Sequence, residues 1–135
     1  MTTEKIHGGC LCGAVTYEAE TVYRMYLYCF CSRCRKKSGT AHSANLFLDT
    51  QYFHWLSGED HVINYRLPDA DGVTNCFCGT CGCRMPRVTE KGVSIPAGSL
   101  NTSPHADPDT CIYWDSRAPW LPSREEIQKV ADSSL

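Results

Sequence analysis

The stretch YCFCSRCRKKSG at residues 28–39 holds three thiols, Cys29, Cys31 and Cys34, within six positions. Residues two apart on a strand project to the same side, and a turn after the second cysteine can return the third sulfur to the same point. Zinc has four ligands in structural sites, whereas a catalytic zinc keeps three protein ligands and one open position. The triplet therefore predicts either an open, reactive metal site or a closed one completed from elsewhere in the chain.

Two further cysteine pairs also have metal-ligand spacing. Cys10 and Cys12 form C-x-C, and Cys78 and Cys81 form C-x2-C within FCGTCG. The glycines of FCGTCG tolerate the tight, partly left-handed backbone that wraps amides around metal-bound sulfurs. Such a knuckle favours a zinc site when a second cysteine pair exists elsewhere in the sequence.

The seven clustered cysteines fit two metal ions, as a group of four and a group of three. If Cys10, Cys12, Cys78 and Cys81 form the group of four, that site is saturated and structural. Its binding free energy would then be folding free energy. Spacing alone leaves alternatives open: the C-x2-C pair could join the triplet, or Cys83, Cys111 or a histidine could complete a second structural site. Otherwise we interpret Cys76, Cys83 and Cys111 as small core residues.

Composition indicates a soluble globular chain of 135 residues, with 42% hydrophobic residues, 21% charged residues and a net charge of −2. This length predicts a single domain spanning residues 1–135. The charge argues against a nucleic-acid partner. No apolar run is long enough for a membrane span, and MTTEKIHGG lacks the apolar core of a signal peptide. We expect a cytoplasmic protein, of undetermined oligomeric state, whose ten cysteines bind metal or react.

Short strands are expected to position these cysteines. Segments rich in β-branched or aromatic residues and bounded by turn formers predict strands at residues 13–20, 23–29, 44–50, 61–67, 72–78, 92–98 and 110–115. One short helix is expected from Ser32 through SRCRKK. A second is expected at 123–130, where Ser123 and Glu126 form a capping-box pattern. The sum is a mainly antiparallel β domain.

Six motifs together resemble a known family. They are GGCLCGAVTY (8–17), CFCSRCRKKSG (29–39), FHWLSGED (53–60), FCGTCG (77–82), AGSLN (97–101) and IYWDSRAPW (112–120). In this order they are similar to the glutathione-dependent formaldehyde-activating enzyme (GFA) family, which also contains centromere protein V. The resemblance implies an Mss4-like fold of small antiparallel sheets with zinc knuckles. It also implies the four-plus-three partition, with two Zn²⁺ per chain, one structural and one catalytic.

The resemblance further implies a carbon–sulfur lyase reaction. Family members are associated with adding formaldehyde to glutathione to give S-hydroxymethylglutathione. We expect Cys29, Cys31 and Cys34 to form the catalytic centre, where a thiol such as glutathione binds as thiolate or a small aldehyde is polarised. The alternative is a non-catalytic, zinc-stabilised binding or scaffold module, as centromere protein V suggests.

Basic residues lie within the triplet and directly after it. They are Arg33, Arg35, Lys36 and Lys37. Such cations can neutralise an anionic metal–sulfur cluster and bind a carboxylate. We predict that Arg35 and Lys36 bind the carboxylate of the peptide-like thiol.

Overall fold

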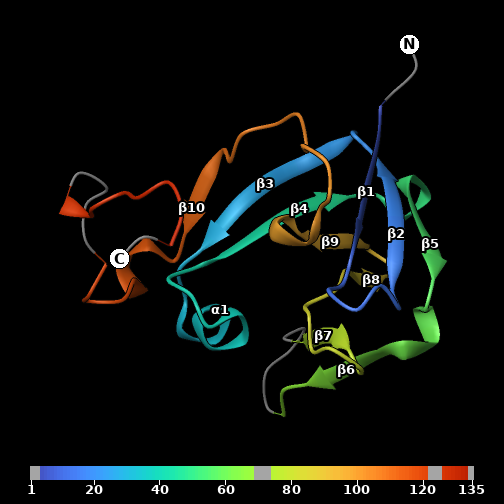
Figure 1. The fold of residues 1–135 in the computed structure, drawn as a ribbon, viewed down its shortest axis with the longest axis horizontal. Helices are drawn as coiled ribbons and strands as arrows, with labels where there is room; N and C mark the ends of the chain where they lie inside the picture. The colour runs from blue at the N-terminus through green and yellow to red at the C-terminus, as the bar shows by residue number, and fades with distance from the viewer. Residues whose placement is uncertain (1–3, 69–73, 122–125, 134–135) are drawn as a thin grey trace.

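The computed structural model describes residues 4–68, 74–121 and 126–133, and short strands dominate it (Figure 1). The strands are β1 (Lys5–Gly9), β2 (Thr16–Glu20), β3 (Tyr23–Cys29), β4 (Ser43–Leu48), β5 (Phe53–Ser57), β6 (Val62–Arg66), β7 (Thr74–Cys78), β8 (Arg87–Thr89), β9 (Gly92–Pro96) and β10 (Thr110–Ile112). They form three small sheets with the strand orders β1-β2-β5, β10-β3-β4-β9-β8 and β6-β7. Pairing is antiparallel except between β10 and β3. The predicted class, mainly β with an Mss4-like arrangement of small sheets, is confirmed.

The main core lies between the three-stranded and the five-stranded sheet. Alternation along residues 13–20 predicts a common face for Val15, Tyr17 and Ala19, and all three are buried. The core cluster combines Ile6, Tyr17, Ala19, Leu46, Leu48, Phe53, Val93 and Ile95. Because alternate residues of β4 and β9 enter this core, the residues between them face the other side of the five-stranded sheet.

One α-helix, α1 (Ser32–Ser38), follows β3 as expected. Cys31 is its N-cap, and its sulfur accepts the Cys34 N–H, while Gly39 ends the helix in the left-handed conformation. No helix in the described part of the chain is both long and apolar enough to cross a membrane.

Several predicted elements differ from the structure. The capping-box helix at 123–130 is wrong where it can be checked, because residues 126–130 form no α-helix, and the rest of it lies outside the described residues. The strand predicted at 110–115 ends at Ile112, and a separate 3₁₀ turn covers Trp114–Ser116. Strands β1, β5 and β8 were not predicted. These strands are short or contain glycine, and sheet pairing rather than local propensity holds them.

Tyr17 offers a test of the core. Its hydroxyl shares a 2.6 Å hydrogen bond with Ser99 Oγ, so Tyr17→Phe should lower the free energy of unfolding at pH 7 by about 1 kcal/mol. Burial raises the pKa of Tyr17 from 10.0 to about 12. The unfolded chain therefore ionises first, and this stabilisation is lost as the pH rises from 10 to 12. Phenylalanine has no ionisable hydroxyl, so the difference in the free energy of unfolding between wild type and Tyr17→Phe should become smaller as the pH rises above 10.

Urea denaturation at a series of pH values measures both effects. Tyr65→Phe, at a ring that is 54% exposed, is the control and should change little. If the difference in the free energy of unfolding between Tyr17→Phe and wild type stayed constant above pH 10, burial would not raise the pKa of Tyr17 as stated.

Candidate metal centres and the adjoining cavity

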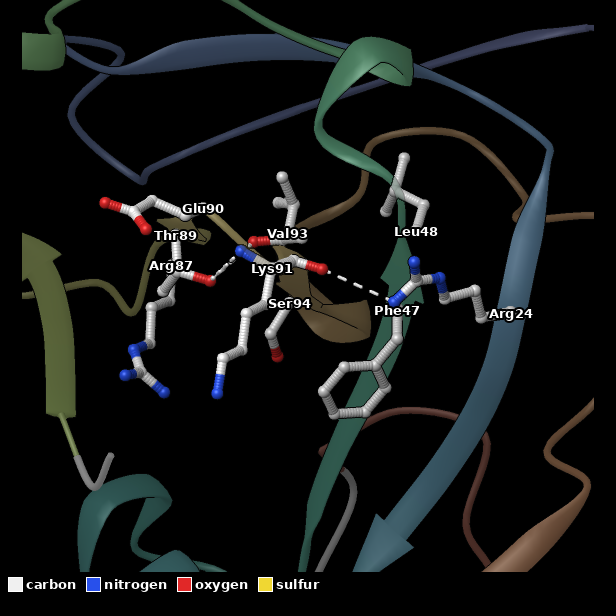
Figure 2. A pocket seen from close by; sticks show the side chains of 10 residues that line it. Arg24, Phe47, Leu48, Arg87, Thr89, Glu90, Lys91, Val93 and Ser94 are labelled. Atoms are coloured by element: carbon white, nitrogen blue, oxygen red, sulfur yellow. Dashed lines mark hydrogen bonds between the residues drawn. The ribbon is translucent and has the colours of Figure 1, made fainter. Parts of the chain in front are cut away.

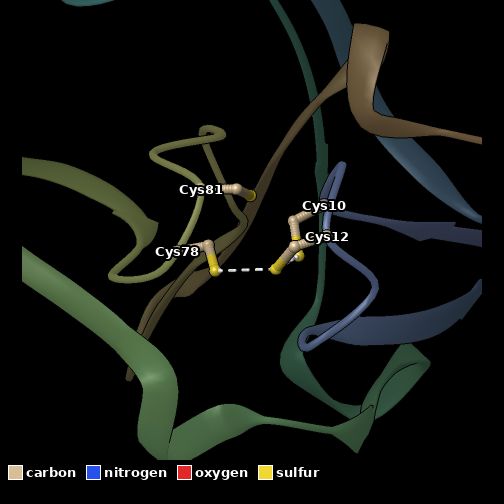
Figure 3. A group of neighbouring side chains, drawn as sticks. All are labelled: Cys10, Cys12, Cys78 and Cys81. Atoms are coloured by element: carbon tan, nitrogen blue, oxygen red, sulfur yellow. Dashed lines mark hydrogen bonds between the residues drawn. The ribbon is translucent and has the colours of Figure 1, made fainter.

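Four cysteine sulfurs meet where the β1–β2 loop approaches the turn after β7 (Figure 3). The sulfurs of Cys10, Cys12, Cys78 and Cys81 all lie within 4.8 Å of one another. Cys12 Sγ is 3.5 Å from Cys10 Sγ and 3.8 Å from Cys78 Sγ. A tetrahedron with Zn–S bonds of about 2.3 Å has edges of about 3.8 Å. The donor set and its spacing therefore fit zinc.

Each of the two loops that supply these sulfurs contains a glycine in the left-handed backbone conformation. Gly13 follows Cys12 with φ 79°, and Gly82 follows Cys81 with φ 77°. This left-handed turn lets amides face the sulfurs. The Val15 N–H donates to Cys10 Sγ at 3.3 Å, and the Thr80 N–H donates to Cys78 Sγ at 3.4 Å.

Amide hydrogen bonds also favour thiolate in this group. Hydrogen bonds from the backbone of Cys83, and then of Cys12, lower the pKa of Cys81 to about 6. Thiolate is the form of cysteine that binds metal, so the local backbone supports the ligand state that zinc requires.

The four-cysteine group joins parts of the chain that are far apart in sequence. Cys12 and Cys78 are 66 residues apart. Around them lies a second small core of Val15, Cys78 and Met85, with partly buried neighbours that include Trp55 and Val62. The group therefore ties the three-stranded sheet to the β6-β7 sheet.

The triplet sulfurs converge at the junction of β3 and α1. Cys29 is the last residue of β3, Cys31 is the helix N-cap and Cys34 lies in the first turn of α1. Their sulfurs also lie within 4.8 Å of one another, and no further Cys, His, Asp or Glu from the described residues joins them. The structure thus groups the cysteines as four plus three, without the C-x2-C pair, Cys83, Cys111 or a histidine in the triplet.

The closeness of the three thiols in the triplet favours the binding of a cation. Burial, reinforced by the sulfur of Cys34, raises the pKa of Cys29 to about 12. Burial also acts on Cys31, but hydrogen bonds from the Cys34 backbone and from the neighbouring thiols outweigh it and lower the pKa of Cys31. Three thiolates so close together repel one another, so a bound cation is needed to hold them all deprotonated.

A cavity of about 500 Å³ opens beside the triplet. Its lining contains all three cysteines and four basic residues, Arg33, Lys37, Arg84 and Arg87. Burial lowers the pKa values of both Lys37 and Arg84, whereas the sulfur of Cys34 opposes this in each case. These two half-buried cations therefore face a site that is expected to carry negative charge.

Arg33 and Lys37 line this cavity, but Arg35 and Lys36, the two residues predicted to bind the substrate carboxylate, lie elsewhere. Arg35 directs Nη2 at the carbonyl oxygen of Ser116, 3.5 Å away. Lys36 lines a neighbouring hollow of about 300 Å³ that includes Tyr65 and shares Arg33 and Lys37 with the cavity at the triplet. Neither residue lines the cavity at the triplet, so their predicted role with a substrate carboxylate stays a prediction without support from this geometry.

Arg84 and Arg87 were missed because they are about fifty residues from the triplet in sequence. The available signal was the run CRMPR at 83–87, directly after the knuckle. A knuckle that is fixed by metal also fixes the direction of the residues that follow it. The basic residues of that run could therefore be predicted to lie near those of α1.

The remaining cysteines occupy three different environments. Cys76 is buried, as expected for a core residue, and it also lines the triplet cavity. Cys83 lies beside the four-cysteine group and accepts the Leu11 N–H at 3.3 Å. Cys111 is exposed on β10, so its interpretation as a core residue is wrong.

Histidines near the clusters have other partners. The ring of His42 stacks on Tyr28 with 4.1 Å between centroids, and its Nδ1 lies 3.1 Å from the carbonyl oxygen of Ser43. His7 Nε2 is 3.4 Å from a carboxylate oxygen of Glu18. Neither belongs to a cysteine group.

Small antiparallel sheets joined at cysteine knuckles define a class of β protein with two candidate metal centres. The family model described as glutathione-dependent formaldehyde-activating enzyme matches residues 5–116. The chain belongs to this family. A crystal structure of a Rhodobacter sphaeroides protein is similar, with a TM-score of 0.55 and 23% identity over 78% of this chain and 97% of that one. At this identity the likeness shows the fold.

The four-cysteine group predicts a strong effect of losing one ligand. Structural zinc contributes about 10–16 kcal/mol of binding free energy in zinc-finger peptides, so Cys81→Ser should destabilise the fold by several kcal/mol. It should also lower the zinc content by about one ion per chain. Cys83→Ser is the matched control, since its sulfur lies outside the group, and should keep its zinc.

Elemental analysis of the purified protein and thermal unfolding measure these effects. If Cys83→Ser lost zinc while Cys81→Ser kept it, the assignment of ligands would be wrong.

Proposed function

We propose that this protein is a zinc-dependent carbon–sulfur lyase that forms or cleaves the adduct between a thiol, such as glutathione, and a small aldehyde, such as formaldehyde. The observation that carries the proposal is the triplet: three converging sulfurs, with no fourth ligand among the described residues, beside a cavity rich in cations. Three protein ligands with one open position is the arrangement of catalytic zinc. Membership of the family supports the choice of thiol and aldehyde.

The reaction is a balanced addition. The sulfur of the thiol attacks the carbonyl carbon and an S–C bond forms. The C=O π bond breaks and its electron pair moves to oxygen, which takes up the proton that the thiol has lost. Zinc, when bound by the triplet, would supply a soft Lewis acid that favours thiolate over thiol at neutral pH.

Residues of the cavity supply charge compensation. Three thiolates and one Zn²⁺ carry a net charge of −1, and a bound substrate thiolate makes it −2. Lys37 and Arg84, both half-buried at the cavity, are placed to offset that charge. Because they are partly desolvated, their interaction with the anionic centre is stronger than it would be in bulk water.

The state of the cysteines also indicates the cellular compartment in which the protein acts. All ten cysteines are free in the structure. Clustered free thiols are suited to a reducing environment, so we propose that the protein acts in the cytoplasm.

Glutathione and ¹³C-labelled formaldehyde provide the direct test of activity. NMR exchange spectroscopy on the zinc-loaded protein should show interconversion of free and adduct formaldehyde faster than the spontaneous rate. Cys31→Ser should return exchange to the spontaneous rate, because it removes a ligand of the open site. Cys111→Ser, an exposed thiol outside both groups, should keep wild-type exchange.

Zinc content and circular dichroism show whether Cys31→Ser retains the fold and the other ion. If wild-type protein gave no acceleration with glutathione or with several other thiols, the enzyme proposal would fail. The non-catalytic scaffold module would then be the better account.

A further inference from the structure

A second cavity, of about 700 Å³, lies on the outward face of the five-stranded sheet (Figure 2). Three residues, Phe47, Arg87 and Ser94, line both this cavity and the one at the triplet. The two hollows therefore adjoin one another. Together they form a groove that starts at the triplet and ends near Lys91, and we call it the sheet groove.

Strand register explains how the sequence builds this groove. Met25 pairs with Phe47, Phe47 with Ser94 and Ser94 with Arg87, which makes one row across β3, β4, β9 and β8. Because Leu46, Leu48, Val93 and Ile95 are buried on the core side, Phe47 and Ser94 face outward. Cys29 lies four residues along β3 from Met25, so it is on the same face as this row.

Two cations of the sheet groove have no acidic partner among the described residues: Arg87, where the two cavities meet, and Lys91, at the end away from the triplet. In the described part of the chain, no carboxylate oxygen lies within 4.0 Å of the side-chain nitrogens of Arg87 or Lys91. Figure 2 shows both side chains extending in the same direction, whereas Glu90 points away from them. Arg24, by contrast, is ion-paired with Asp49 at 2.5 Å and donates to the Lys91 carbonyl oxygen at 3.3 Å.

The geometry also sets the length of a ligand that can reach both ends. Four residues along β3 and three strand spacings give a Cα separation of roughly 19 Å between Cys29 and Arg87. The long arginine side chain reaches into that gap and shortens it. Three extended residues span about 10 Å, so a tripeptide-sized molecule matches the groove better than a two-carbon thiol does.

We propose that the sheet groove binds the tail of the substrate thiol and selects extended thiols that carry a carboxylate far from their sulfur. The sulfur lies at the triplet, and the distant carboxylate binds Arg87, with Lys91 as a second cation. Arg87 can hold a carboxylate through two parallel hydrogen bonds, which a lysine cannot do. This inference rests on the proposed function, because it assigns a tail to the thiol of that reaction.

The probe for the groove is S-methylglutathione, which keeps the carboxylates of glutathione but has no thiol. Titrated into ¹⁵N-labelled, zinc-loaded protein, it should shift the amide resonances of Phe47, Lys91 and Ser94. Arg87→Gln should weaken binding about tenfold, and Arg87→Lys should restore part of it, as loss of a charge-assisted bidentate contact predicts. Arg66→Gln, on the exposed surface of β6, is the matched control and should bind like wild type.

Kinetics separate this inference from the proposed function. Arg87→Gln should lower the preference for glutathione over 2-mercaptoethanol, measured as the ratio of kcat/KM values, about tenfold. If the wild-type enzyme catalyses exchange but Arg87→Gln leaves both this ratio and the binding of S-methylglutathione unchanged, the groove assignment is overturned while the reaction stands. If binding depends on Arg87 but no thiol is turned over, the groove stands and the reaction is overturned.

Discussion

The close approach of cysteine sulfurs in two groups is the constraint on which this structure depends. Seven thiols in two tight groups are unfavourable as bare thiolates, because like charges at such short distances repel one another strongly. A cation in each group relieves that repulsion. In the group of four it would also join the β1–β2 loop to the turn after β7, across 66 residues of chain. Metal affinity and folding are therefore expected to be one equilibrium.

That junction also determines what surrounds the triplet. The chain leaves the knuckle through Arg84 and enters β8 at Arg87, and both residues reach the cavity beside Cys29 and Cys34. Meanwhile the five-stranded sheet uses its two faces differently. One face is closed by the apolar core, and the other carries Phe47 and Ser94 on the floor of a cationic groove. The four-cysteine group thus lies at the start of the segment that brings Arg84 and Arg87 to the triplet cavity.

Some features of the fold and of the candidate site could be predicted from local sequence patterns. Cysteine spacing predicted the two pairs and the triplet, the family resemblance implied their four-plus-three grouping, and the alternation along β2 predicted the burial of Tyr17. The helix after Cys31 also followed from the sequence. These features depend on residues that are near one another, or on a ligand chemistry that permits few partners.

The remaining features depend on pairing between distant segments. Arg87 lies at the groove only because β8 pairs with β9. The capping-box pattern at Ser123 and Glu126 was a local signal that the described residues beyond 125 do not follow. The strand Lys5–Gly9 ends in two glycines, which weaken its propensity, but its pairing with β2 is complete along its length.

The central claim is that one ion is enclosed by sulfur and the other keeps an open position. Anomalous diffraction at the zinc edge, on crystals of the metal-loaded protein, tests it most directly. The account predicts one zinc bound by Cys10, Cys12, Cys78 and Cys81, and a second bound by Cys29, Cys31 and Cys34 with a water or an added thiol as its fourth ligand. A second zinc closed by another side chain of this protein, or no metal at the triplet, would contradict it.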